Sequence, residues 1–192
     1  MGNFGRCGWL SAGFWLALGL PALALPGQTA TQVEAWIQGN ATLRPRPGEQ
    51  LVVHRTDTAA RRFTFQASVF PPTGVQGVPL LGKIRSEHFL LVDIIDGVSM
   101  TRLEESLRRI YGADVYSDYE RAERVMVYPT AETPPYTNRY LVIQGELLVG
   151  DRFGYWVEMT SDTRGRIETG RVTLLLREDV AALGDFLRGA PL

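Results

Sequence analysis

Alternating apolar and polar positions predict a series of β-strands between residues 51 and 177. Over residues 62–70, Phe63, Phe65 and Ala67 fall on one face of a strand, and the polar residues between them fall on the other. Residues 83–95 end in Phe89-Leu-Leu-Val-Asp-Ile-Ile95, which is apolar on both faces apart from Asp93, as is typical of a buried central strand. Further strands are expected over residues 51–55, 125–128, 139–149, 153–160 and 166–177, with a hairpin turn at Gly150-Asp151.

Apolar residues spaced three or four positions apart predict helices before, between and after the strands. Their apolar stripes are Val33, Trp36 and Ile37; Leu103, Leu107 and Ile110; and Val180, Leu183 and Leu187. Capping boxes are expected at Thr31–Glu34 for the first helix and at Thr101–Glu104 for the second. Gly112 and Gly189 would end the second and third helices.

The order of these elements predicts an α+β fold, in which a mostly antiparallel sheet is joined by a helix after each of two strand groups. Residues 25–48 would form an N-terminal helix and a linker, and residues 49–192 would form a single domain. A chain of this size can bury a self-sufficient apolar core.

The two halves of this domain also show a similarity that predicts an internal duplication. Gly82-Lys-Ile-Arg-Ser86 can be aligned with Gly165-Arg-Ile-Glu-Thr169, within repeats over residues 49–112 and 123–189. Two such repeats would share one core and be related by an approximate two-fold axis, with their helices on one side of the sheet.

Residues 1–24 have the composition of a secretory signal peptide. Arg6 precedes an apolar run over residues 8–20, and Ala22-Leu23-Ala24 supplies the small residues that a signal peptidase recognises. The pattern predicts export and cleavage after Ala24. The alternative is an uncleaved membrane anchor, because the apolar stretch read through to Leu25 approaches the ~18 residues that span a bilayer.

The composition restricts the functions open to the mature chain. The full chain has 45% hydrophobic and 21% charged residues, which is typical of a soluble globular protein. A formal net charge of −1 gives no attraction for nucleic acid or for an anionic membrane surface. The single cysteine, Cys7, lies in the leader, so the mature chain has no disulfide and no cysteine-ligated metal, iron–sulfur cluster or haem. No cofactor is expected.

A serine nucleophile is the sharpest catalytic hypothesis that the sequence offers. Ser99 follows a predicted strand, but Thr101 occupies the position where a nucleophile elbow has its last glycine. Both histidines, His54 and His88, precede the serine, whereas the hydrolase fold with this elbow places its histidine after it. Ser99 is therefore interpreted as a residue near a helix start, and no catalytic residue is assigned.

Acidic residues do not have the spacing of a catalytic pair or of a metal site either. Asp93 and Asp96 would point to opposite faces of a strand, so they are not expected to act together. Asp93 is expected to be a core residue that pairs with an arginine. Asp114, Asp118 and Glu120 lack metal-ligand spacing, and no metal ligand is assigned.

Aromatic residues are concentrated between the two strand groups and in the hairpin that follows. Tyrosine and tryptophan combine a large apolar area with a polar tip, so they are favoured at interfaces. The candidate interaction surface consists of Tyr116, Tyr119, Tyr128, Tyr136, Tyr155 and Trp156. The alternative is that these side chains pin a long connection to the body of the domain by packing.

Three segments, HRTDTAARRFTFQASVFPPTG, GVSMTRLEESLRRIYG and GDRFGYWVEM, resemble a family of exported cyanobacterial proteins without an assigned activity. The resemblance covers most of the mature region and includes no catalytic motif. It implies a location in the periplasm or the thylakoid lumen.

These patterns favour a non-catalytic exported protein that acts through contacts with another protein, as an accessory or assembly factor. Such a protein should carry an exposed aromatic patch around residues 116–140. One alternative is a carrier of a small apolar ligand, which needs an enclosed apolar cavity of several hundred cubic ångströms. Another is a hydrolase whose site is assembled from scattered residues.

Overall fold

A computed structural model describes residues 25–72, 75, 79, 81–129, 136–138 and 141–189, with the backbone alone for residues 136–138. The predicted leader, residues 1–24, lies outside the described residues. None of the described helices is both long enough and apolar enough to cross a membrane.

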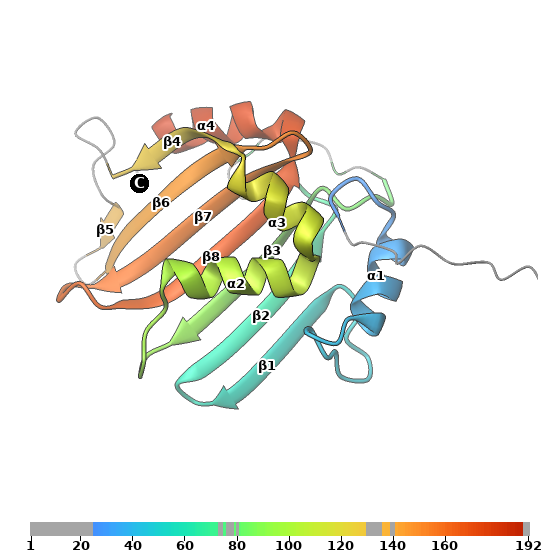
Figure 1. The fold of residues 1–192 in the computed structure, drawn as a ribbon, viewed down its shortest axis with the longest axis horizontal. Helices are drawn as coiled ribbons and strands as arrows, with labels where there is room; N and C mark the ends of the chain where they lie inside the picture. The colour runs from blue at the N-terminus through green and yellow to red at the C-terminus, as the bar shows by residue number, and fades with distance from the viewer. Residues whose placement is uncertain are drawn as a thin grey trace, which may run out of the picture.

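The centre of the molecule is an antiparallel sheet of eight strands (Figure 1). The strands are β1 (Val52–Thr58), β2 (Arg61–Ser68), β3 (Ser86–Asp93), β4 (Glu123–Tyr128), β5 (Tyr136–Asn138), β6 (Leu141–Val149), β7 (Phe153–Asp162) and β8 (Ile167–Leu176). Their spatial order is β1-β2-β3-β8-β7-β6-β4, and β5 pairs with β6 on the same side as β4. This arrangement confirms the predicted α+β class and the predicted hairpin of β6 and β7.

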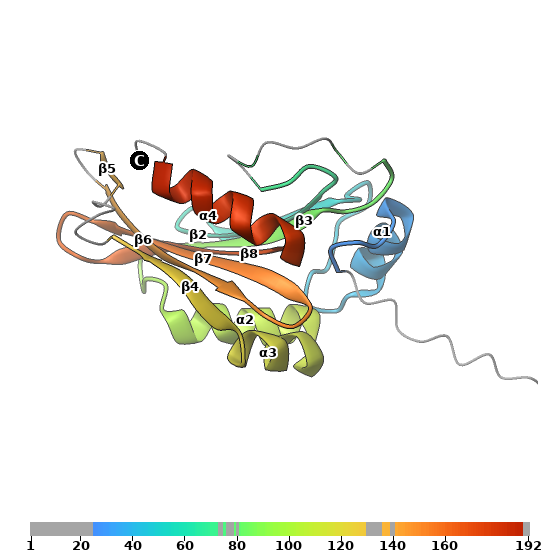
Figure 2. The same cartoon turned by 90° about the horizontal axis from the view of Figure 1, so that it is seen from above.

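Among the described residues, four α-helices pack on or beside the sheet. They are α1 (Ala30–Gly39), α2 (Met100–Tyr111), α3 (Ala113–Glu120) and α4 (Val180–Gly189), and a 3-10 turn, η1 (Arg177–Asp179), leads into α4. Figure 2 shows α2 and α3 on one face of the sheet, here called the α2 face, and α4 on the other, the α4 face. The expectation that the helices lie on one side is therefore wrong.

The two faces bury separate apolar clusters. On the α2 face, Leu103 and Leu107 of α2 are buried against Phe65 and Phe89 of the sheet, and α1 adds Val33 and Ile37 to this cluster. On the α4 face, the stripe of α4 packs on the sheet; the cluster contains Tyr128, Leu147, Trp156, Leu175, Val180, Leu183 and Leu187. Helices α1, α2 and α4 thus pack on the sheet or beside it through the apolar stripes that the sequence predicts, with Trp36 of α1 half-buried.

Both helix starts lie two residues before the predicted capping boxes. Helix α1 begins with a capping box between Thr29 and Gln32, because an isolated β-bridge from Thr29 to Lys83 fixes the chain at that point. Helix α2 has Ser99 as its N-cap, and the Ser99 hydroxyl accepts the backbone N–H of Arg102 at 3.2 Å. The interpretation of Ser99 as a helix-start residue is confirmed.

The pairing of β3 with β8 joins the two halves of the chain. Phe89 lies opposite Val172, flanked by the pairs Ser86–Leu175 and Val92–Thr169. This register is compatible with a two-fold axis that passes between Phe89 and Val172. The proposed repeats require an axis at this position. Such an axis, however, would place α2 and α4 on the same face, and they lie on opposite faces. The duplication stays a prediction.

Candidate functional site

The side chains of the predicted interaction surface are largely interior. Tyr155 is 0% exposed and Tyr128 2% exposed, and Tyr119 and Trp156 are also buried. Tyr116 is half-buried, and the side chain of Tyr136 lies outside the described residues. The expected exposed aromatic patch is therefore not what the described residues form.

These aromatic residues also belong to different clusters. Tyr119 and Tyr155 lie in the cluster of the α2 face, with their rings edge-to-face and 5.4 Å apart between centroids, and Tyr116 packs beside them. Tyr128 and Trp156 lie in the cluster of the α4 face, where the Trp156 indole N–H donates to the Tyr128 hydroxyl at 2.7 Å. The sheet separates the two groups, so they serve packing rather than a common surface.

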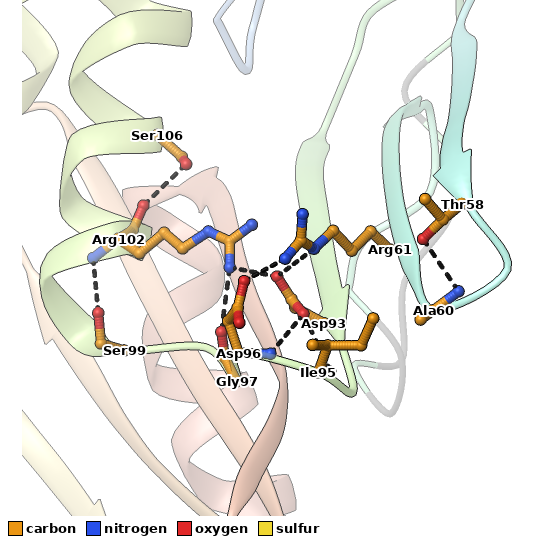
Figure 3. A network of polar contacts seen from close by, with 10 residues as sticks. All are labelled: Thr58, Ala60, Arg61, Asp93, Ile95, Asp96, Gly97, Ser99, Arg102 and Ser106. Carbon is orange, nitrogen blue, oxygen red and sulfur yellow. Dashed lines mark hydrogen bonds and ion pairs between the residues drawn. The ribbon is translucent and has the colours of Figure 1, made fainter.

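Asp93 lies at the end of β3, in the polar network that Figure 3 shows. Its Oδ2 accepts from Arg102 at 2.8 Å and lies 3.3 Å from Nε of Arg61, while its Oδ1 accepts the backbone N–H groups of Ile95 and Asp96. The hydrogen bond from Arg102 is the main reason why the pKa of Asp93 lies far below its usual range. The predicted pairing of a buried Asp93 with arginine is confirmed.

Asp96 lies closer to Asp93 than the sequence indicates. Because β3 ends at Asp93, the alternation of a strand no longer applies to the turn that follows. Arg61 pairs with both carboxylates, so the expectation that they diverge to opposite faces is wrong (Figure 3). Both carboxylates pair with arginine in this network.

A groove on the α2 face lies between the first turn of α2 and strand β4. We call it the β4 groove; its volume is about 300 Å³ and it is lined by Met100, Val127, Tyr128, Pro129, Gln144, Gly145, Glu146, Val157 and Met159. Its walls come from α2, β4, β6 and β7. The helices leave this part of the α2 face uncovered, as Figure 1 shows to the left of α2.

The lining of the β4 groove is mainly apolar, with polar groups on β6. The one carboxylate among the described lining residues, Glu146, accepts a hydrogen bond from Nε of Arg124 at 2.6 Å. Gln144, on the same side of β6, is the neutral polar group of the groove. At Gly145 a Cβ atom would lie only 2.5 Å from the Tyr128 hydroxyl oxygen, so glycine at this position lets the Tyr128 side chain pack on the opposite, α4 face of the sheet.

The groove was not predicted from the sequence, and one signal for it was present. Val127 alternates with Met126 and Tyr128 in β4, so it had to face the opposite side from them. Its 46% exposure arises because no helix covers β4 on that side, which depends on the length and direction of α3. No local sequence pattern shows where α3 ends relative to β4.

Within the described part of the chain, no three or more histidine, cysteine, aspartate or glutamate residues are grouped so that they could hold a metal ion. Comparisons with protein-family models, with curated proteins and with solved structures found no match for this chain. The protein is therefore classed by its fold and its groove. It is an antiparallel α+β domain with helices on both faces of the sheet and an apolar groove beside an edge strand.

Proposed function

We propose that this chain is a non-catalytic binding protein that holds a small, mainly apolar ligand in the β4 groove. The observation that carries the proposal is the groove itself, because its volume of about 300 Å³ lies at the lower end of the range for small-molecule sites. A carrier was expected to need an enclosed cavity, whereas the β4 groove is open to solvent, so we propose an open site. The proposal gains support over docking of another protein through the aromatic residues, because most of these are buried.

The side chains of the groove indicate the chemistry of the ligand. Met100, Val127, Val157 and Met159 offer apolar contacts, and methionine adapts its shape to different ligands. The amide of Gln144 can both donate and accept a hydrogen bond, so it suits one neutral polar end of the ligand. An apolar body with a single polar end fits this lining.

A binding role rather than a catalytic one is supported by the same residues. The described lining contains no serine, threonine, cysteine, histidine or lysine, so no common nucleophile or histidine base is in place. Its carboxylate, Glu146, is paired with Arg124. We also propose an exported location, the periplasm or the thylakoid lumen, from the leader pattern of residues 1–24 and the family resemblance.

The test is binding of an apolar probe to the mature protein, with two matched variants. Val127→Glu places a charge in the groove, and Ile95→Glu makes the same change at a 60% exposed apolar residue in the turn after β3. Titration with an anilinonaphthalene dye should give saturable binding with one site. Val127→Glu should weaken it at least tenfold, and Ile95→Glu should leave it unchanged, with melting temperatures confirming that both variants fold.

Native mass spectrometry of the purified protein supplies the second readout. A bound small molecule that Val127→Glu removes and Ile95→Glu retains would support the proposal. Equal dye binding by both variants, or binding that never saturates, would reject the groove as the site.

A second candidate function is docking of another protein at the edge of the sheet. Strand β4 ends the strand order, and Val125 and Val127 on it are 45% and 46% exposed. An edge strand with apolar side chains can pair with an extended segment of a partner. Val125 does not line the groove, so Val125→Glu should abolish a protein contact and leave dye binding intact, which separates the two functions.

A further inference from the structure

A second, smaller cleft lies on the α4 face, away from the β4 groove. Its volume is about 100 Å³, its floor consists of residues from β2, β3, β8 and β7, and Pro71 and Pro72 form part of its wall. The register of the sheet explains the floor: His88 lies opposite Gln66 on one side and opposite Thr173 on the other. Thr173 in turn lies opposite Trp156.

These floor residues are unusual for the middle of a sheet because most of them are polar. Elsewhere on this face, α4 covers Leu147 and Leu175, but no described helix covers the row through His88. In the described part of the chain, no hydrogen bond holds the side chains of Gln66, His88 and Thr173, which line the cleft, and Nε of Arg171 is buried without a hydrogen-bond partner. Partly buried polar groups of this kind require partners from a ligand or from water.

A guanidinium group lines the cleft. Arg171 is the one cation among the described lining residues, and these include no aspartate or glutamate. Outside the lining, Oε2 of Glu158 lies 3.4 Å from Arg171 and offsets part of its charge, while Oε1 of the same carboxylate accepts the Tyr128 hydroxyl at 2.8 Å. The Arg171 guanidinium is further positioned over the Trp156 ring, 5.6 Å from its centroid.

His88 remains neutral in this environment. Burial, together with the nearby Arg171 charge, lowers the pKa of His88 to about 4. At neutral pH its ring therefore offers one N–H donor and one acceptor nitrogen. Together with the Thr173 hydroxyl and the Gln66 amide, it supplies neutral hydrogen-bond donors around a single guanidinium.

We propose that this cleft binds a small oxyanion, of the size of a carboxylate or a phosphate, through Arg171, His88 and Thr173. The guanidinium supplies the charge and a planar set of donors that matches oxyanions, and the neutral groups complete the hydrogen bonding. The volume excludes a larger molecule from the cleft itself, so the ligand is either a free ion or the anionic end of a longer molecule. This site is separate from the β4 groove and does not depend on its function.

The test is an NMR titration of the mature protein with sodium phosphate and, separately, with sodium acetate, at constant ionic strength. The chain has two histidines, so the ring signals of His88 and of the exposed His54 can be assigned by substitution. We expect a saturable shift of the His88 signal, with His54 unchanged, and a rise in the pKa of His88 because a bound anion offsets the Arg171 charge. The two titrations identify which geometry of oxyanion the cleft prefers.

Matched variants assign the binding to the cleft. Arg171→Gln should weaken binding at least tenfold, and Arg62→Gln, an exposed arginine on the same face in β2, should leave it unchanged. Thr173→Val keeps the shape of the floor and removes one donor, so it should weaken binding even if Arg171→Gln fails to fold. A shift that stays linear with concentration, or equal binding by wild type and Thr173→Val, would mean that the cleft holds only water and would overturn the proposal.

Discussion

The hydroxyl group of Tyr155 donates a hydrogen bond to Oδ2 of Asp118 over 2.7 Å, which ties the buried face of β7 to helix α3. The other carboxylate oxygen, Oδ1, accepts the backbone N–H groups of Asp151 and Arg152 at 2.9 and 3.3 Å. One aspartate, 2% exposed, thus holds both a core tyrosine and the turn between β6 and β7. This contact fixes α3 over the sheet.

Removing the Tyr155 hydroxyl should therefore destabilise the fold. Tyr155→Phe leaves a buried carboxylate oxygen without its donor, which costs about 1–3 kcal/mol of unfolding free energy. Urea denaturation followed by circular dichroism measures the change. Tyr116→Phe is the control, because Tyr116 is only half-buried, and it should change the free energy by less than about 0.5 kcal/mol. Equal effects of the two substitutions would contradict this role of the Asp118 contact.

Gly150 has no room for a side chain beside the same aspartate. A Cβ atom there would lie 2.3 Å from Oδ2 of Asp118 and 3.1 Å from Cε2 of Tyr155. We expect Gly150→Ala to destabilise the protein by about 1–3 kcal/mol, since the carboxylate or the turn must move. Gly39→Ala, where no atom lies within 4 Å of the new Cβ, should be neutral or slightly stabilising. A thermal melt of both variants checks the contrast.

Glu87 should make the fold less stable as the pH rises. Its side chain is 0% exposed on the α2 face, and burial raises the pKa of Glu87 to about 8, with Tyr111 as its polar neighbour. Between pH 4.5 and 8 the folded state keeps this proton while the unfolded state has lost it. The unfolding free energy therefore falls across this range, by a few kcal/mol in order of magnitude, and levels off above it.

The measurement is the unfolding free energy of wild type and Glu87→Gln between pH 6.5 and 8.5. Below pH 6.5 the lowered pKa of His88 acts in the opposite direction, because the unfolded state then binds a proton that the folded state rejects down to about pH 4. In the chosen range Glu87→Gln should remove most of the decline. A variant that declines as steeply as wild type would show that Glu87 is not the group responsible.

The Asp93 carboxylate should increase the unfolding free energy when the pH is above its ordinary pKa, and this contribution should be lost in acid. The pKa of Asp93 is lowered mainly by the hydrogen bond from Arg102, so its contribution is complete above about pH 3.8, the unfolded value, and disappears as the pH falls through the lower folded value. Asp93→Asn should lower the melting temperature at pH 7 more than Asp96→Asn, because Asp96 is exposed. The difference should shrink progressively below about pH 3.8, and a difference of unchanged size between pH 7 and pH 2 would contradict the charge-based explanation.

Much of the fold could be predicted because most strands and helices follow simple periods. The stripe Leu103, Leu107 and Ile110 identified α2, and alternation identified β2 and the β6–β7 hairpin. Helix α3 was missed because its buried face, Val115, Asp118 and Tyr119, contains an aspartate. Burial of that aspartate depends on donors 33 residues away in sequence, at Asp151, and no local pattern contains them.

The described residues of the candidate interaction surface do not form one exposed patch, and part of the reason can be seen in the sequence. Tyr155 and Trp156 are neighbours in a strand, and neighbouring side chains of a strand point to opposite faces of the sheet. They could not share one surface once β7 was predicted. The β4 groove and the cleft at His88, by contrast, depend on where the helices leave the sheet uncovered, and periodicity does not determine that.

The pairing of β3 with β8 affects the order in which the strands of the sheet can pair during folding. Strands β1, β2 and β3 form a meander early in the chain, yet the remaining edge of β3 is covered by β8, which is the last strand before the C-terminal helix. Pairing across such a distance must first close a long loop, so it is slow compared with local pairing. Until β8 is in place, the edge of β3 is an unpaired apolar strand edge, which is the kind of edge that pairs with other chains.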